Sequence, residues 1–220
     1  MLFSTRARPT SGHPFETELH RHVPAPPRSW KAMRDAGVVR QLFDYSCGSA
    51  ALATLLSTPT SPVTERDILH EVLDSLTDEQ KAETMEAGLS LLDLRQAAER
   101  RGLRAAGYRV GPEFLKKLTR PVLVFVRPDG YRHFAVFRGV RGDRVFLADP
   151  ARGNVRYPIW RFLEMWQTED EKGVIFLIDS ATPPLLHLTE GPAQPELLGA
   201  RELLDIGPTR IGEARPVLLR

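Results

Sequence analysis

The pattern of hydrophobic and polar positions divides the middle of the chain into a helical first half and a strand-rich second half. Residues 47–57 are small and apolar nearly all round, which predicts a buried helix. Three more helices are indicated by capping residues at their starts, one of them also by apolar positions at helical spacing. These helices are expected at 64–76, 77–88 and 91–101.

Strands are expected in the second half, at 103–110, 122–126, 131–138, 144–149 and 173–178. The run at 122–126 is continuously apolar, which is typical of a central strand, and the next two segments alternate. Short helices are expected at 112–118 and around 160–166. Helices first and strands later, with hairpin connections, predict an α+β domain with an antiparallel sheet.

The two ends of the chain differ from this pattern. Residues 1–29 carry five prolines and three histidines without an apolar period, which predicts an extended N-terminal arm. Residues 180–220 are also rich in proline, and the one element expected there is a short amphipathic helix at 196–204. The folded domain is therefore predicted to span 30–179.

Charge and composition narrow the class of protein. The 30 Lys and Arg residues nearly balance the 28 Asp and Glu residues, which argues against nucleic acid as a partner because phosphate binding needs a basic face. The single cysteine excludes a disulfide framework and a thiolate-built zinc site. His20 and His22 have no further ligands at metal-site spacing, so neither a metal nor another cofactor is expected.

The apolar runs are also too short for a membrane segment. They fall far below the roughly 18 residues of a membrane helix, and the start lacks the apolar region of a signal peptide. The sequence as written therefore predicts a cytoplasmic protein. A true start upstream, with a signal peptide, would instead make it periplasmic or exported.

The lone Cys47 is the most informative position. It falls at the predicted start of the buried helix, where free backbone N–H groups and the positive end of the helix dipole favour a thiolate. Such a position, with help from a protonated histidine, lowers a thiol pKa from about 8.5 toward about 3.5–7.5. The alternative is that Cys47 is only a small buried hydrophobic residue.

A cysteine nucleophile needs a base, and elimination leaves His133. Four of the six histidines lie in the predicted arm or tail. His70 lies among acidic residues on the polar face of its helix, which predicts a solvated side chain. His133 begins an alternating strand, although a half-buried histidine of a sheet would look the same.

An imidazole base needs an orienting group, and Asp149 ends the next predicted strand. If 141–143 forms a three-residue loop, Asp149 faces Ala135 and becomes a diagonal neighbour of His133, at about 7–8 Å between backbones. A two-residue loop shifts the register and separates the two side chains onto opposite faces. Gly142 favours the longer loop, which needs a left-handed residue. Alternatively, Asp149 only starts a turn.

Gln41 is the candidate oxyanion donor. It precedes Cys47 by six residues, and its amide and the Cys47 backbone N–H would point at a developing oxyanion. Alone, Gln41 is just a polar residue. Together the four residues have the order and topology of a papain-type thiol site, with the cysteine on a helix start and the His and Asp across a cleft on a sheet.

Four stretches carry a family resemblance. They read VVRQLFDYSCGSAALATLL at 38–56, GLSLLDL at 88–94, YRHFAV at 131–136 and VFLADPARG at 145–153. They resemble the bacteriocin-processing, or double-glycine, cysteine peptidase family over about 36–178. That family has a papain-like fold and cleaves after paired small residues, often Gly-Gly, between leader and mature peptide. The resemblance implies a cysteine endopeptidase whose central cysteine-bearing helix packs on a C-terminal antiparallel sheet.

The resemblance also implies roles for single residues. It makes Cys47 the nucleophile, His133 the base, Asp149 the orienting group and Gln41 the oxyanion donor. Transporter-fused members carry an acidic residue before the cysteine, whereas this chain has Ser46 and no membrane or ATPase domain. The chain therefore looks like a stand-alone branch, acting on a peptide or protein substrate in association with an export or pilus-like system.

Two other functions stay open at this point. A peptide-binding module of a secretion or assembly system would use the same cleft without cutting. A transpeptidase would use the same thioester but transfer the acyl group to an amine instead of water.

Overall fold

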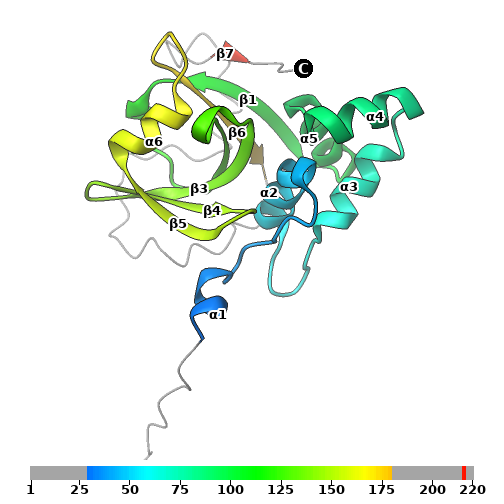
Figure 1. Ribbon diagram of the computed structural model, residues 1–220, viewed down its shortest axis with the longest axis horizontal. Helices are drawn as coiled ribbons and strands as arrows, with labels where there is room; N and C mark the ends of the chain where they lie inside the picture. Colours follow the sequence, from blue (N-terminus) through cyan, green and yellow to red (C-terminus); the bar gives the residue numbers. More distant parts are fainter. Residues whose placement is uncertain (1–28, 180–214, 217–220) are drawn as a thin grey trace, which may run out of the picture.

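The computed structural model describes residues 29–179 and 215–216 (Figure 1). Helices α2 to α5 gather on one side of the molecule, and most of the sheet lies with α6 on the other (Figure 1). The helices are α1 Trp30–Arg34, α2 Cys47–Leu56, α3 Glu65–Leu73, α4 Asp78–Ala87, α5 Leu91–Arg100 and α6 Ile159–Trp166. Short 3₁₀ turns are η1 Asp44–Ser46, η2 Pro112–Phe114 and η3 Pro128–Gly130. The strands are β1 Arg104–Val110, β2 Val122–Val126, β3 His133–Arg141, β4 Arg144–Asp149, β5 Gly153–Pro158, β6 Gly173–Asp179 and β7 Arg215–Pro216.

The predicted arm over 1–29 and tail over 180–220 lie almost wholly outside the described residues. The expected helix at 196–204 lies outside them as well. Among the described residues, the α+β arrangement is confirmed, with helices in the first half and an antiparallel sheet in the second.

The strands form one antiparallel sheet in the order β5-β4-β3-β2-β6-β1-β7. Strands β2 to β5 follow one another as hairpins, and β6 then enters between β2 and β1. The side chains of β2 alternate between the two faces. Leu123 and Phe125 join a core shared with α2, α3 and α5, whereas Val124 joins a second core with α6. A strand buried on both faces reads as a continuous apolar run, which explains the pattern at 122–126.

Helix α2 packs on α3 on one side and on β3 on the other, and every residue from Cys47 to Leu55 is buried. The helices after it begin as the sequence predicts. Thr64, Thr77 and Ser90 each accept a hydrogen bond from the backbone N–H three residues on, in complete capping boxes. These caps fix where α3, α4 and α5 start, and the buried apolar residues of α3 and α5 share a core with α2.

Of the described helices and strands, α1, β5 and the two-residue strand β7 were not predicted. Strand β5 lies at the edge of the sheet and pairs only with β4, so most of its residues are half-buried or exposed and give no apolar pattern. Helix α1 has only five residues and buries none of them. The helix expected at 112–118 is shorter than predicted, because only Pro112–Phe114 is helical.

The β3–β4 hairpin corrects one expectation. Arg141 pairs with Arg144, so the loop has two residues, Gly142 and Asp143, and the predicted three-residue loop is wrong. Gly142 has a φ of +59° at the first loop position. Glycine is favoured there in two-residue turns, so its left-handed conformation serves the shorter loop.

A β-bulge at Arg138 then restores the predicted register. The pairing of β3 with β4 shifts at this residue, which is extra in β3. Beyond the bulge, Val136 pairs with Ala148, which is the register that the longer loop would have produced. His133 and Asp149 therefore fall on the same face of the sheet after all.

The Arg138 side chain anchors this bulge. Although it is buried, its Nη1 donates to Asn154 Oδ1 at 2.7 Å and its Nη2 to the Gly37 carbonyl at 2.6 Å. Asn154 in turn donates to the Ala36 carbonyl at 2.8 Å. Burial lowers the pKa of Arg138. The bulge is thereby tied to β5 and to the segment that leads toward Gln41.

Gly48 allows α2 to approach the sheet closely, and a larger residue there is expected to weaken the fold. A Cβ atom on Gly48 would lie 3.3 Å from side-chain atoms of Leu94 and of Phe134. We expect Gly48→Val to lower the free energy of unfolding by about 1–3 kcal/mol, as overpacking does. Ala82→Val, on the exposed face of α4, should cost less than about 0.7 kcal/mol. Equal losses in urea denaturation would contradict this packing.

Candidate active site

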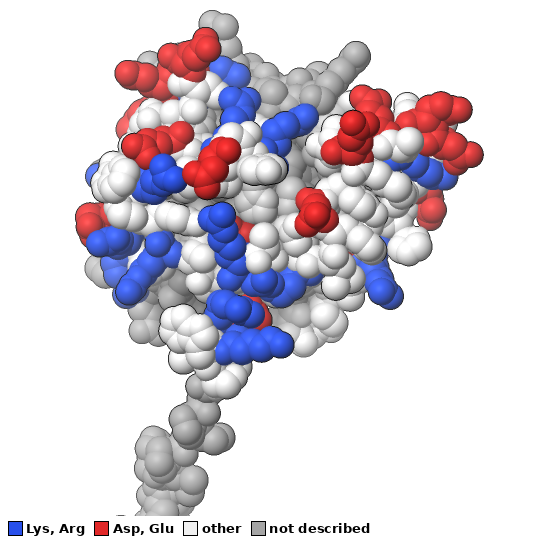
Figure 2. Space-filling view, viewed as in Figure 1, with Lys and Arg blue, Asp and Glu red and all other residues white. Residues whose placement is uncertain are grey.

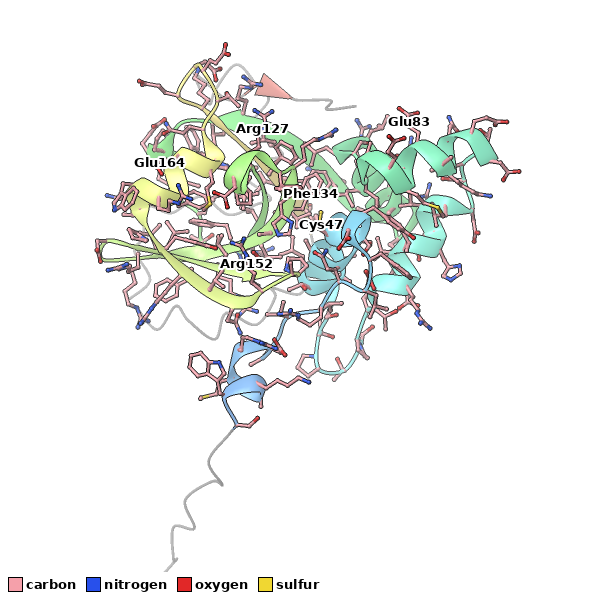
Figure 3. The ribbon with its side chains drawn as sticks, in the orientation of Figure 1. Cys47, Glu83, Arg127, Phe134, Arg152 and Glu164 are labelled. Carbon is pink, nitrogen blue, oxygen red and sulfur yellow. The ribbon has the colours of Figure 1, made fainter. Side chains whose placement is uncertain are left out.

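The structure brings three of the four predicted residues together. Cys47 is the first residue of α2, His133 the first of β3 and Asp149 the last of β4. His133 Nε2 lies 3.0 Å from Asp149 Oδ1, and the same ring interacts with the Cys47 side chain. Figure 3 shows Cys47 beside Phe134, the residue after His133, where α2 meets β3. Cys47 is 7% exposed and Asp149 is 4% exposed, so the group is largely shielded from solvent.

Asp149 also holds the turn that follows it. The backbone N–H groups of Ala151 and Arg152 donate to Asp149 Oδ1 at 2.8 Å and 3.1 Å. The two interpretations of this residue, a turn-starter and a partner of His133, therefore both apply. The turn bonds fix the carboxylate at the end of β4, which limits the orientations available to the ring of His133.

Competing influences act on the pKa of His133. Burial lowers this pKa, but hydrogen bonds and charge interactions with Asp149 and Cys47 raise it more strongly, to about 9 from an ordinary value of 6.5. The pKa of Asp149 shifts the other way. Burial alone would raise it, but the hydrogen bond and charge of His133, with the two turn N–H groups, hold it below its usual value. The arrangement favours an imidazolium beside a carboxylate.

Gln41 lies in the loop that leads to Cys47, next to the Asp149 turn. Its backbone N–H donates to the Pro150 carbonyl at 3.1 Å. Its side-chain Nε2 donates to the Phe43 carbonyl at 3.0 Å, while its Oε1 is buried without a hydrogen-bond partner among the described residues. The structure thus places Gln41 near the site, with one of its two amide protons engaged inside its own loop.

A buried polar pair beside Cys47 was missed by the sequence analysis. Ser46 is fully buried and Glu65 is 2% exposed. The Ser46 hydroxyl donates to Glu65 Oε1, which also accepts the Leu42 N–H at 2.8 Å. In the sequence, Glu65 looks like an ordinary acidic residue in the first turn of a helix, and no pattern marks it as buried.

Charge is distributed unevenly on the face that contains the site. In Figure 2, basic side chains gather on the sheet side of this face, where Figure 3 labels Arg127 and Arg152. Acidic side chains gather over α4, which carries Glu83, and also near α6, where Figure 3 labels Glu164. Acidic side chains thus lie on both the helical side and the sheet side of this face, with basic side chains between and below them.

No cluster of three or more His, Cys, Asp or Glu side chains within 29–179 and 215–216 is arranged to hold a metal ion. In the same part of the chain, none of the helices combines the length and the apolar character needed to cross a bilayer.

The fold and this grouping define a class of protein. A thiol at the start of a central helix, facing an imidazole and a carboxylate on an antiparallel sheet, is the arrangement of the papain-like cysteine peptidases. Comparison with known proteins agrees, because the model of the peptidase C39 family matches residues 35–176. The chain belongs to the peptidase C39 family and is a cysteine peptidase, as the sequence resemblance implied.

The similar proteins include two named as probable proteases and one named as a processing and transport protein. "Probable functional amyloid protease FapD" of Pseudomonas aeruginosa is 34% identical, over 81% of this chain and 75% of that protein. The protein of the same name from Pseudomonas fluorescens is 32% identical, over 81% of this chain and 80% of that protein. "Lactococcin-G-processing and transport ATP-binding protein LagD" of Lactococcus lactis is 25% identical, over 59% of this chain and 17% of that protein.

A solved structure supports the fold. The peptidase domain of Streptococcus ComA, described as a bi-functional ABC transporter involved in a quorum-sensing pathway, superposes with a TM-score of 0.53. The match covers 67% of this chain and 98% of that domain at 20% sequence identity. The papain-like fold predicted from the sequence is therefore confirmed.

We expect the His133 imidazole to titrate near pH 9 in the folded protein. Replacement Asp149→Asn removes the negative charge that raises this pKa but leaves the burial that lowers it, so the midpoint should fall well below 9. The measurement is an NMR titration of the histidine ring signals. The control is His70→Gln on the exposed face of α3, which should leave the His133 midpoint unchanged. A midpoint of about 9 in Asp149→Asn would contradict the assigned cause.

The same pKa makes a prediction for stability. Because the pKa of His133 rises from 6.5 to about 9 on folding, its stabilising contribution is fully present below about pH 6.5 and is lost as pH rises through about 9. The free energy of unfolding should therefore fall over this range less steeply in Asp149→Asn than in the wild type.

Proposed function

We propose that this chain hydrolyses peptide bonds with Cys47 as nucleophile, His133 as base and acid, and Asp149 as the group that orients the imidazole. The observation that carries this proposal is that one imidazole ring contacts both partners. His133 Nε2 lies 3.0 Å from Asp149 Oδ1, and the same ring interacts with the Cys47 thiol. Because Nε2 is used for Asp149, Nδ1 is the nitrogen left to exchange a proton with the thiol.

The proposed reaction has two halves. The Cys47 thiolate attacks the carbonyl carbon of the scissile bond, and the carbonyl oxygen becomes an oxyanion. The His133 imidazolium then gives its proton to the leaving amine, the carbon–nitrogen bond breaks, and a thioester remains. His133 next takes a proton from water, the hydroxide attacks the thioester, and the thiolate leaves as the acid product forms. The raised pKa of His133 suits the first half, which needs an imidazolium.

The oxyanion is proposed to bind the Gln41 side-chain amide and the Cys47 backbone N–H. The first N–H groups of an α-helix have no acceptor within the helix, and Cys47 begins α2. Gln41 keeps one amide proton that the bond to Phe43 does not use. Its loop is tied to the Asp149 turn through Pro150, which supports a position near the developing charge.

The substrate is proposed to be a peptide or protein of an export or assembly system, cleaved after small residues such as Gly-Gly. Two observations support this choice. FapD carries the name of a functional amyloid protease, and LagD that of a lactococcin-G-processing protein. A pair of small residues would also suit a nucleophile that is 7% exposed, because little room is left beside the thiol.

Cys47→Ala is expected to abolish cleavage of peptides that contain Gly-Gly or Ala-Ala pairs. Loss of a nucleophile lowers turnover by about 10⁴-fold or more. Mass spectrometry of the products should show two fragments whose masses sum to the peptide plus one water. Undiminished cleavage by Cys47→Ala would reject the proposal. An acyl fragment joined to an added amine would indicate transpeptidation, and binding of intact peptide by the wild type without cleavage would indicate a binding module.

Gln41→Ala is expected to lower kcat by about 10²–10³-fold while KM changes little, because an oxyanion donor acts mainly in the transition state. Gln96→Ala, on the exposed side of α5, is the matched control and should retain wild-type kcat. Steady-state kinetics on one Gly-Gly peptide compares the two variants. A Gln41→Ala enzyme with wild-type kcat would exclude the amide from the oxyanion site.

A further inference from the structure

Glu65 is a buried carboxyl group that the proposed mechanism does not use. It is the first residue of α3 and only 2% exposed. Its Oε1 accepts two hydrogen bonds, from the Leu42 N–H at 2.8 Å and from the Ser46 hydroxyl. Its Oε2 is buried with no hydrogen-bond partner among the described residues. Both hydrogen bonds of Glu65 Oε1 therefore go to the loop between α1 and α2.

These two donors stand next to the two groups proposed to bind the oxyanion. Leu42 follows Gln41 directly, and Ser46 directly precedes Cys47. One carboxyl oxygen thus joins both ends of the segment that separates the Gln41 side chain from the Cys47 backbone N–H. Hydrogen bonds to a carboxylate are shorter and stronger than those between neutral groups, so the bonds from Leu42 and Ser46 to Glu65 hold the two ends of this segment strongly.

The rest of the loop does not hold these ends equally well. The Ser46 hydroxyl lies 2.8 Å from the Phe43 carbonyl as well as near Glu65, but it has one proton and donates to one acceptor at a time. The Phe43 carbonyl also accepts the Gln41 amide and the Ser46 N–H. Apart from Glu65, the two ends of the segment are held by this carbonyl, by the Phe43 N–H that donates to the Ser46 hydroxyl at 3.2 Å, and by the Gln41 N–H that donates to the Pro150 carbonyl. Unlike these groups, Glu65 joins the two ends from another helix.

Burial of Glu65 is costly for the fold. A buried carboxyl oxygen without a partner loses its hydration and gains no hydrogen bond in return. An apolar residue of similar size would avoid that cost and would often be as stable or more stable. Local departures of this kind are expected at functional sites.

We propose that Glu65 is a positioning residue, whose Oε1 sets the separation between the Gln41 amide and the Cys47 N–H so that both reach one oxyanion. This inference rests on the proposed function. The hydrogen bonds of Glu65 go to Leu42 and Ser46 and not to the thiol, so its loss should impair steps that form an oxyanion and spare steps that need only the thiol and imidazole.

Two reagents separate these steps. With iodoacetamide, the Cys47 thiolate displaces iodide: the carbon–sulfur bond forms as the carbon–iodine bond breaks, and no oxyanion arises. With a peptide aldehyde, the Cys47 thiolate adds to the carbonyl carbon, and the carbonyl oxygen becomes an oxyanion that takes up a proton as the hemithioacetal forms. The affinity for the aldehyde therefore reports on the oxyanion donors. The main variant is Glu65→Met, which keeps the volume and removes the acceptor, and Glu65→Gln restores one acceptor oxygen.

In Glu65→Met we expect kcat and aldehyde affinity each to fall by at least about 10-fold, toward the loss caused by removing one oxyanion donor. KM and the alkylation rate should stay within about 3-fold of wild type, and Glu65→Gln should recover most of the loss. The control is Glu71→Met on the same helix, which breaks only the ion pair with Arg101 and should keep wild-type kcat. If Glu65→Met does not fold, Ser46→Ala removes one of the two donors and should weaken aldehyde binding several-fold at an unchanged alkylation rate.

Two results would overturn the inference. The first is that Glu65→Met keeps wild-type turnover and wild-type affinity for the aldehyde. If Glu65→Met does not fold, the same result in Ser46→Ala would count in its place. The other is an equal fall in alkylation and turnover, which would mean that Glu65 supports the whole site. A wild-type protein that neither cleaves peptides nor binds the aldehyde would instead refute the proposed function, and this inference with it.

Discussion

His133 and Asp149 meet because one extra residue in β3 sets the register of the hairpin that carries them. The two-residue loop at its tip would place their side chains on opposite faces, and the bulge at Arg138 reverses that outcome. The buried Arg138 side chain holds the bulge against Asn154 of β5 and against the Gly37 carbonyl. A feature about five residues from His133 along the strand thus decides the geometry of the site.

The second requirement is that α2 brings its thiol to that pair. Gly48 offers no side chain at the point where α2 meets Phe134, so the helix packs close to β3 and Cys47 reaches His133. Burial then acts on the electrostatics. Burial disfavours the charged forms of both His133 and Asp149, but the interaction between the ring and the carboxylate more than offsets this cost. The raised pKa of His133 keeps the ring charged at neutral pH.

Much of this could be predicted from the sequence, where local signals are strong. The capping residues Thr64, Thr77 and Ser90 mark helix starts by direct hydrogen bonding, and the run at 122–126 marks a strand buried on both faces. Elements that bury little, such as α1 and the edge strand β5, leave no such signal. The residues proposed for catalysis were identified by elimination and by the family resemblance.

Other features depend on tertiary context. A bulge has no distinct sequence pattern, and the predicted register was right for a reason that the structure does not bear out, since the loop has two residues and not three. Glu65 is unremarkable in its own helix, and only the folded loop gives it partners in Leu42 and Ser46. Local periodicity thus indicates which residues face a core, but not which buried polar groups meet across elements.

The account rests on a covalent intermediate at Cys47. The most direct test is to mix the protein with a Gly-Gly peptide, quench in acid during turnover, and measure the intact protein mass followed by peptide mapping. A thioester predicts a mass increase equal to the N-terminal acyl fragment, located on the peptide that contains Cys47. Cleavage of the peptide with no adduct, or with an adduct on another residue, would contradict it.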